Sequence, residues 1–233
     1  FEELARRIIA ADTDGEVRLK ASGEFDWKLR EATGKAKAPF VAEFVKMLVE
    51  SGEKVVVFGW HRAFYNILLK ELAMFFPALY TGSESPTQKD RAKKAFIEDQ
   101  EVRVLLISNR AGEGLDGLQY ASSTVVHGEL DWSPAVMDQN TCRVARDGQP
   151  KPVFTYTLLS QDGSDPVIAD VLGIKAQQQR GIRDPSLGGS ADPLKGADAG
   201  RAKALAHAFL KKHNPTLLAR TIQEREDETK RRA

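Results

Sequence analysis

Hydrophobic and polar positions follow two alternating rhythms from about Ala38 onward. Short apolar runs bounded by polar, glycine or proline residues predict buried strands. They span 54–59, 78–82, 102–108, 124–130 and 152–160. Between them, apolar residues recur at the three- and four-residue spacing of helices, over 39–50, 63–75, 86–99, 134–146 and 165–179. This alternation predicts an α/β fold whose mostly parallel sheet is covered by helices on both faces.

Two of the predicted helices begin with recognisable capping residues. Ser85 precedes Pro86 and Gln88, a pattern that predicts an N-cap, a proline at the first helical position and a capping box. Ser133 and Pro134 repeat the cap and the proline. Local chemistry therefore supports the helix starts that the periodicity indicates.

The pattern divides the chain into four segments. A polar, weakly patterned N-terminal segment contains one helical stretch at 1–11, and a Gly/Pro-rich stretch separates the α/β lobe from a basic tail with helices expected over 201–213 and 215–232. The predicted bounds of N-terminal helical or linker segment, lobe, linker and tail are 1–38, 39–181, 182–200 and 201–233.

The charge of the chain is balanced overall but uneven along its length. There are 34 Lys and Arg against 33 Asp and Glu, a net +1. Residues 201–233 hold nine basic and four acidic side chains (+5), whereas residues 1–200 hold 25 and 29 (−4). Such a tail suits a cationic arm on a polyanion or a charged, solvated helix. The helical spacing of Leu205, Ala208 and Phe209 favours a helix docked on the lobe or on a partner protein.

Several protein classes are excluded by composition. The single cysteine, Cys142, cannot form an internal disulfide or a Cys-based zinc site, so we expect a reducing compartment and no metal site. No apolar run approaches the ~18 residues of a membrane span, and the N-terminus lacks a signal-peptide layout. We therefore expect a cytoplasmic protein, nucleoid-associated if bacterial, without a membrane partner. A start at Phe1 instead of Met suggests a piece of a longer chain.

The phosphate and magnesium cradle of a complete ATPase is missing from the sequence. The pair Gly34 and Lys35 resembles the end of a phosphate-binding loop, but Leu29 stands where that motif needs glycine and Ala36 where it needs Ser or Thr. No acidic cluster ends a predicted strand. The chain by itself is therefore expected to be inactive as an ATPase.

Polar segments follow the second and third predicted strands, at the edge where open α/β sheets bind ligands. Thr81, Gly82 and Ser83 lead into the Ser85-capped helix, and small hydroxyl residues at a helix start suit a phosphate group. Residues 108–116 (SNRAGEGLD) combine hydroxyl, amide and cationic groups with two glycines. This composition favours a loop that binds a polyanion or a nucleotide.

The most informative segment is 138–149 (DQNTCRVARDGQ). Arg143 and Arg146 are three residues apart, so a continuous helix would project both from one face. Each guanidinium is a planar fork that matches phosphate oxygens. Ion pairs with surface carboxylates are the simpler alternative. This alternative is weaker for two arginines that occur together with Gln139 upstream and with Gly148-Gln149 at the predicted end of the helix.

Taken in order, these segments resemble the second RecA-like lobe of superfamily II helicases, and more closely that of Swi/Snf-type DNA-translocating ATPases. The resemblance covers about 33–181, through 55–62 (motif IV), 80–96 (the Asp-Gly-Ser stretch), 105–116 (motif V), 129–134 (ELDWSP) and 139–149 (motif VI). The chain departs from the family pattern at Thr81, which replaces the acid, at Cys142 for Gly, at Ala145 for His and around Glu113.

The resemblance implies a RecA-like lobe with five to six strands and a helical C-terminal tail, forming half of an ATP-dependent double-stranded DNA translocase. It implies that Arg143 and Arg146 act as arginine fingers on ATP and Mg²⁺ held mainly by the first lobe of the same polypeptide. The implied nucleotide contacts are Gly114, Asp116 and Gln139, with Asp116 implied to bind the ribose. The implied nucleic-acid contacts are His61, Thr81, Gly82, Ser83, Ser108, Asn109, Arg110 and Trp132.

Two other function classes remain open on the sequence. A non-catalytic nucleic-acid-binding or protein-interaction module could keep the RecA-like fold. A small-molecule α/β enzyme would need a nucleophile and a base, and none of the four histidines is suitably spaced from an acid: His61, His127, His207 and His213. We interpret His127, inside a predicted strand, as a core residue.

Overall fold

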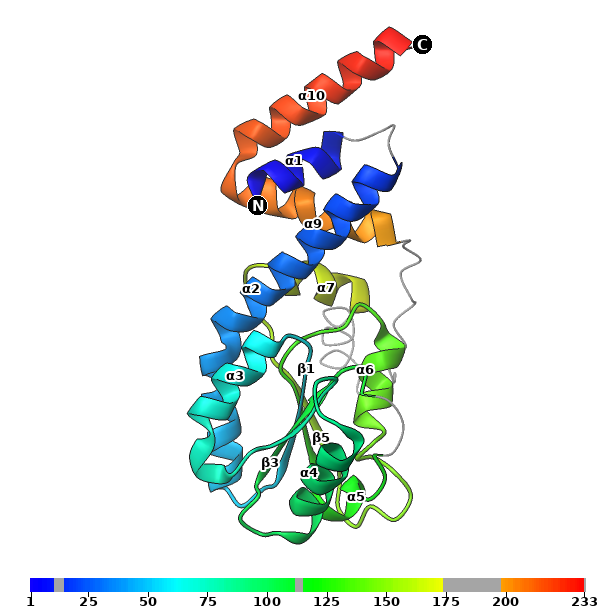
Figure 1. Cartoon of the computed structure of the whole chain (residues 1–233). Helices are drawn as coiled ribbons and strands as arrows, with labels where there is room; N and C mark the ends of the chain where they lie inside the picture. Colours follow the sequence, from blue (N-terminus) through cyan, green and yellow to red (C-terminus); the bar gives the residue numbers. More distant parts are fainter. Residues whose placement is uncertain (11–14, 112–114, 174–197, 233) are drawn as a thin grey trace, which may run out of the picture. The chain divides into compact units, whose positions relative to one another are not determined.

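The computed structural model describes residues 1–10, 15–111, 115–173 and 198–232 (Figure 1). The chain forms two compact units, Gly34–Ser160 and a second one made of Phe1–Thr33 together with Gln161–Ala233. The long helix α2 (Gly15–Glu50) contributes residues to both units. It runs across the boundary that the sequence predicts at residue 38.

The Gly34–Ser160 unit is built on a parallel five-stranded sheet of order β2-β3-β1-β4-β5. Val57 of β1 pairs with Leu106 of β3 and Val126 of β4, so the most apolar strands occupy the centre. The five strands are β1 (Val55–Gly59), β2 (Ala78–Tyr80), β3 (Val104–Ser108), β4 (Thr124–His127) and β5 (Phe154–Thr157). These strands confirm the predicted α/β class and the parallel sheet.

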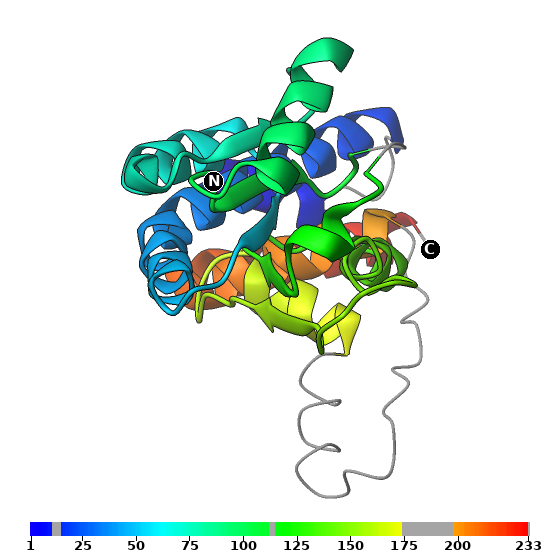
Figure 2. The same cartoon turned by 90° about the horizontal axis from the view of Figure 1, so that it is seen from below.

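Helices cover both faces of this sheet (Figures 1 and 2). Alternate residues of a strand point to opposite faces, so Val57 packs in one core with α2 and α3 (Arg62–Glu71), while Phe58 packs in the other. That second core also contains Phe96 of α4 (Pro86–Glu98) and Leu118 of α5 (Leu118–Ala121). The helix α6 (Pro134–Thr141) follows β4, and a short 3₁₀ turn, Ala73–Phe75, follows α3.

The predicted capping box is present at the start of α4. The Ser85 hydroxyl accepts a hydrogen bond from the Gln88 backbone N–H, and the Gln88 side chain accepts one from the Ser85 N–H at 2.9 Å. The stripe predicted for 39–50 is displaced, however, because Phe40 is 76% exposed whereas Val41 and Val45 are buried. Helix α2 also continues through Pro39, so tertiary packing outweighs the hydrogen bond that a proline removes.

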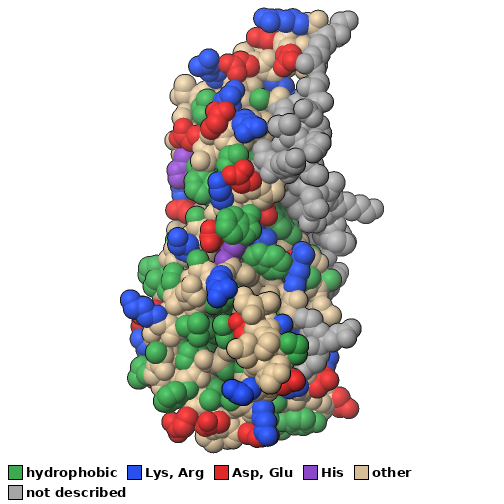
Figure 3. Space-filling view, in the orientation of Figure 1, with side chains coloured by type: hydrophobic (Ala, Val, Ile, Leu, Met, Phe, Trp, Pro, Cys, Tyr) green, Lys and Arg blue, Asp and Glu red, His purple; other side chains and the backbone are tan. Residues whose placement is uncertain are grey.

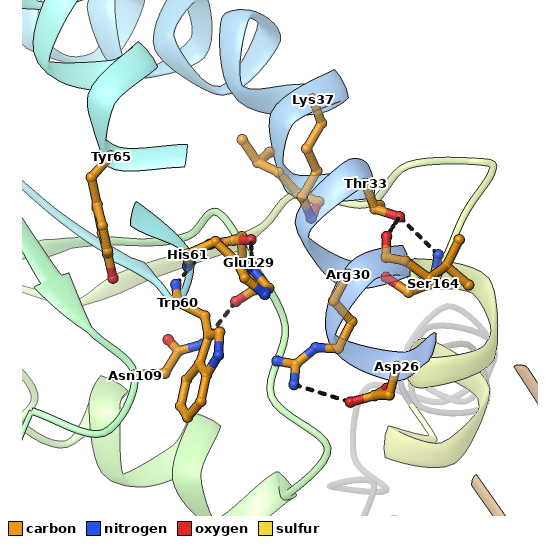
Figure 4. Close-up of polar contacts among 12 residues, drawn as sticks. Asp26, Arg30, Thr33, Lys37, Trp60, His61, Tyr65, Asn109, Glu129 and Ser164 are labelled. Carbon is orange, nitrogen blue, oxygen red and sulfur yellow. Dashed lines mark hydrogen bonds and ion pairs between the residues drawn. The ribbon is translucent and has the colours of Figure 1, made fainter. Parts of the chain in front are cut away.

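The second unit is helical. It comprises the first part of α2 with α1 (Glu2–Ala10), α7 (Asp165–Leu172), α9 (Asp198–His213) and α10 (Pro215–Arg232). The rings of Phe1, Phe25 and Phe209 form a cluster with centroids 5.7–6.1 Å apart, and Leu205 is buried. The first tail helix is thus docked through an apolar face, although Ala208 is exposed. The Ser164 N–H donates to the Thr33 hydroxyl at 3.0 Å (Figure 4).

Two sequence expectations for the C-terminal half lie partly outside the described residues. Helix α7 ends at Leu172, followed by the left-handed Gly173, and the rest of the helix expected to 179 lies outside the described residues. The same holds for most of the 182–200 linker. Within the described ranges, no helix is long and apolar enough to cross a membrane, and no group of three His, Cys, Asp or Glu could hold a metal ion.

Candidate functional site

A cleft of about 360 Å³ lies at the carboxyl ends of β1, β2 and β3. Parallel strands place their carboxyl ends at one edge of a sheet, so segments distant in the sequence meet there. Five residues implied to contact nucleic acid line it: Thr81, Gly82, Ser83, Ser108 and Arg110. The remaining lining residues are Trp60, Arg62, Tyr65, Asn66, Leu69, Leu79 and Glu84.

The turn after β2 forms one wall of the cleft. The backbone N–H and the hydroxyl of Thr81 both donate to the Glu84 carboxylate, at 2.5 and 2.7 Å. The Ser83 N–H donates to the Thr81 hydroxyl at 3.3 Å, and Arg62 reaches the Ser83 hydroxyl at 3.4 Å. Gly82 and Ser83 are exposed, whereas Thr81 is buried. The Glu84 carboxylate therefore accepts the hydrogen bonds of Thr81, a residue that the sequence analysis assigns to a phosphate group.

The opposite wall of the cleft follows β3 and presents a cation. The Arg110 guanidinium lies 4.9 Å from the centre of the Trp60 ring, a cation–π contact, and its Nε lies 3.8 Å from an Asp131 oxygen. The Arg110 side chain remains 67% exposed. Its positive charge is therefore held at the rim and still available to an anion.

Beneath the cleft, Glu129 binds the loop that follows β1 (Figure 4). Its Oε2 accepts hydrogen bonds from the N–H groups of Trp60 at 2.7 Å and His61 at 2.8 Å, and its Oε1 lies 2.7 Å from the His61 Nδ1. The Glu129 carbonyl accepts a bond from the Asn109 side chain at 3.2 Å. His61 and Asn109, both implied to contact nucleic acid, are only 3% and 2% exposed. They therefore support the cleft from below in this conformation.

The polar network continues into α6. The Asn140 side chain donates to the Asn109 side chain at 3.4 Å, and the Ser133 N–H donates to Asp131 at 2.9 Å. Trp132, also implied to contact nucleic acid, is half-buried beside these residues and is not part of the cleft lining. The ELDWSP segment thus acts mainly through Glu129 and Asp131 in the described structure.

The two arginines of motif VI do not leave one helix face, which corrects the sequence prediction. Helix α6 ends at Thr141, and both arginines lie in the turns that follow. Arg143 donates to the Ala111 carbonyl at 2.7 Å, and Arg146 forms an ion pair with Asp116. The acid implied to bind a ribose is therefore the partner of an implied finger.

The segment that follows α6 contains a left-handed glycine. Gly148 adopts a left-handed backbone with φ of +84°, and a Cβ there would lie 2.9 Å from the Tyr120 hydroxyl. Burial lowers the pKa of Arg143. The positive charge of Arg146 lowers this pKa further, so the two guanidiniums still interact. Gln139 is exposed on α6. Gly114, the remaining implied nucleotide contact, lies outside the described residues.

Comparison with known proteins agrees with this geometry. The family model described as "Helicase conserved C-terminal domain" matches residues 37–148. The Drosophila melanogaster protein named SWI/SNF-related matrix-associated actin-dependent regulator of chromatin subfamily A-like protein 1 is 26% identical over 164 residues, 68% of this chain and 21% of that protein. The Homo sapiens lymphoid-specific helicase is 29% identical over 150 residues, 64% of this chain and 18% of its own length. Residues 37–148 are therefore similar to the C-terminal lobe of SNF2-type helicases.

Solved structures show the same fold as this lobe. The Sulfolobus solfataricus SWI2/SNF2 ATPase core in complex with dsDNA superposes with a TM-score of 0.61 at 17% identity, covering 95% of this chain and 46% of that one. The C-terminal part of the Fun30 ATPase domain gives a TM-score of 0.51 at 23% identity, covering 57% and 43%. The chain spans about a fifth of the length of the curated relatives it matches.

The lobe also contains polar residues whose position in the site the sequence did not indicate. Glu84 stands three residues after Thr81, a spacing that allows a local hydrogen bond and could have drawn attention to it. Arg62 belongs to the motif IV stretch, but nothing local shows that it faces the turn after β2. Glu129 begins the ELDWSP segment, yet its partners lie 68 and 69 residues away.

Proposed function

We propose that this chain is the C-terminal half of an ATP-dependent double-stranded DNA translocase. The observation that carries the proposal is that five residues implied to contact nucleic acid, from the segments after β2 and β3, line one cleft with the exposed cation of Arg110. The helicase and chromatin-regulator names of the relatives support a motor, and the dsDNA-bound Sulfolobus structure supports the choice of nucleic acid.

The cleft residues suit phosphate groups better than bases. Exposed Gly82 and Ser83 offer a close backbone approach and a hydroxyl, while Arg62 and Arg110 supply positive charge. Contacts of this kind position a protein on a duplex without reading its sequence, which a translocase requires. Motion along the track then comes from closure of this lobe against a first lobe on the same polypeptide.

The groups offered to a nucleotide fit a partial site. Arg146 is exposed and would exchange Asp116 for phosphate oxygens. The buried Nε of Arg143 has no hydrogen-bond partner within the described ranges. Arginines of this kind stabilise charge in the transition state and contribute roughly 10³–10⁵ in rate in other phosphoryl-transfer systems. ATP with Mg²⁺ supplies the cleaved phosphoanhydride, and the first lobe holds both.

A non-catalytic nucleic-acid-binding module is the second candidate. Arg146 is engaged by Asp116 in the described conformation, and motif VI departs from the family pattern at Cys142 and Ala145. Such a module would keep the cleft and its salt-dependent binding without contributing to hydrolysis.

Duplex binding by the chain tests the cleft. Titration of labelled duplex DNA at three salt concentrations should give log K falling with log salt by roughly 0.9 per phosphate contact. Arg110→Ala should weaken binding and reduce that slope by about one contact. Arg91→Ala, an exposed arginine of α4 outside the cleft, is the matched control. Equal slopes for all three proteins would remove the cleft from the proposal.

Hydrolysis tests the motor half. Purified chain should not turn over ATP, since it has no phosphate-binding loop, and robust turnover would contradict the assignment of ATP to a first lobe. In a two-lobe parent, DNA should stimulate hydrolysis. A parent that binds duplex DNA but hydrolyses nothing would favour the non-catalytic module.

A further inference from the structure

Glu129 is a buried carboxylate that lies outside both implied binding sites. It is 4% exposed, and removing a charged carboxylate from water costs several kcal/mol unless its oxygens are fully bonded. Both of its oxygens are bonded, through the N–H groups of Trp60 and His61 and the His61 ring. All of these side-chain contacts go to the loop that follows β1 and contributes Trp60 to the cleft lining.

The contacts of Glu129 reach the loops that follow β1 and β3, and both loops contribute residues to the cleft lining. Through Trp60 and His61 its carboxylate holds the first residues after β1, and His61 is the N-cap residue of α3, next to Arg62. Through its carbonyl it holds Asn109, whose two chain neighbours line the wall that follows β3. The Asn109 N–H donates to the Gly59 carbonyl at 2.7 Å, which ties the two loops directly.

Helix α2 closes the space behind this carboxylate. A Cβ at Gly34 would lie 2.1 Å from the Glu129 Oε1 and 2.9 Å from its Cδ. Real carbon atoms do not approach so closely, so a side chain at position 34 has to displace the carboxylate. Glu129 is thus held from one side by its donors and from the other by a glycine.

We propose that Glu129 is a positioning residue for nucleic-acid binding, which sets the separation of the loops that follow β1 and β3 through Trp60 and Asn109. The inference rests on the proposed function of the cleft. Glu129 itself does not line the cleft, so its effect on DNA passes entirely through these loops.

Glu129→Gln tests the proposal with little change of shape. One amide oxygen replaces two carboxylate oxygens, so an NH₂ group faces either the two backbone N–H groups or the His61 ring, and the loop after β1 loses part of its anchorage. The backbone carbonyl that holds Asn109 is unchanged. We expect the affinity of the chain for a labelled duplex to fall about tenfold or more. Because phosphate contacts are lost, the slope of log K against log salt should also become shallower by roughly 0.9 per contact.

Two further variants approach the same carboxylate without replacing it. Gly34→Ala displaces Glu129 from behind and should reproduce the shallower slope. Gly23→Ala is the same substitution on the same helix, with nothing within 4 Å of the new Cβ, and should bind like the wild type. Asn109→Ala removes only the anchor of the loop after β3 and provides a milder test if Glu129→Gln fails to fold.

A control for charge is also available. Glu101→Gln removes one negative charge at an exposed site and should leave binding equal or slightly tighter. A decrease in affinity for Glu129→Gln therefore cannot come from the change in net charge, which acts in the opposite direction.

The salt slope separates positioning from a merely structural role. A variant that only unfolds more easily lowers the folded fraction, seen in urea unfolding, and leaves the slope of the folded protein unchanged. Wild-type slopes in Glu129→Gln, Gly34→Ala and Asn109→Ala would overturn the inference and leave the cleft as the binding site. A wild-type chain without salt-dependent duplex binding would overturn the proposed function and this inference together.

Discussion

The Arg146 guanidinium is paired with the Asp116 carboxylate, although the two residues are implied to serve different parts of a nucleotide. Both side chains are exposed, by 43% and 79%. Exposed ion pairs contribute about 0–1 kcal/mol, so exchange of Asp116 for a phosphate requires little energy. The pair holds the arginine near its expected place of action while leaving it available.

Arg146→Ala in a two-lobe parent should abolish most DNA-stimulated hydrolysis and leave nucleotide affinity largely intact. A finger acts on charge that develops in the transition state, so its loss appears in kcat before it appears in binding. Lysine should not restore activity, because it lacks the planar fork. Near-normal kcat in the alanine variant would return Arg146 to the role of a surface ion pair.

Arg143→Ala should be the more destabilising of the two arginine substitutions. The side chain is half-buried and donates to the Ala111 carbonyl, and a hydrogen bond to a charged group contributes about 1.5–3 kcal/mol. Arg146→Ala should lower the free energy of unfolding by about 1 kcal/mol or less. Urea unfolding of the chain measures both, and equal losses would contradict the different burial of the two residues.

Glu84→Ala should tighten duplex binding severalfold. The Glu84 carboxylate covers the N–H and hydroxyl donors of Thr81, so a DNA phosphate has to displace it. Glu84→Gln keeps the acceptor but removes the charge and should have a smaller effect than alanine. Weaker binding by the alanine variant would instead show that Glu84 holds the turn in its binding shape.

His127 should make the chain sensitive to mild acid. Burial lowers the pKa of its ring to about 4, and its Nδ1 has no hydrogen-bond partner within the described ranges. The stabilisation that the neutral His127 ring provides is complete above pH 6.5, the pKa of histidine in the unfolded chain. As the pH falls from 6.5 to 4, protonation of the unfolded chain removes about 3 kcal/mol of stability.

Urea unfolding at pH 7.5 and pH 5 measures this effect. His127→Gln should lose less stability between the two pH values than the wild type, whereas His207→Gln, at an exposed site on α9, should behave like the wild type. The same loss in all three proteins would assign the acid sensitivity to other groups.

Deletion of 201–233 should lower stability and leave the salt dependence of DNA binding unchanged. Leu205 and Leu210 of α9 are buried, and Figure 3 shows basic and acidic side chains intermingled over the helical unit instead of a single basic patch. Leu205→Ala should lower the free energy of unfolding by about 2–5 kcal/mol. Ile222→Ala, at an exposed site on α10, should have a smaller effect. A shallower salt slope after the deletion would instead identify the tail as a cationic DNA arm.

The sequence by itself determined the lobe and the edge on which its chemistry lies. Strands buried on both faces must be apolar throughout, so runs such as 54–59 stand out without any structural knowledge. The capping box at Ser85 and Gln88 is equally local, because its donors and acceptors lie within four residues. Since parallel strands share a carboxyl edge, Thr81 and Arg110 could be expected at one site before their contacts were known.

Only the tertiary structure decided where helices end and which distant groups meet. Helix α6 stops at Thr141, before both motif VI arginines, although the local pattern predicts a helix to residue 146. The N-terminal and C-terminal helices share one core through Phe1 and Phe209, which a scan of neighbouring residues cannot detect. Glu129 is the clearest case, because a carboxylate acquires its role from the donors it reaches, and those donors come from a loop brought to it by folding.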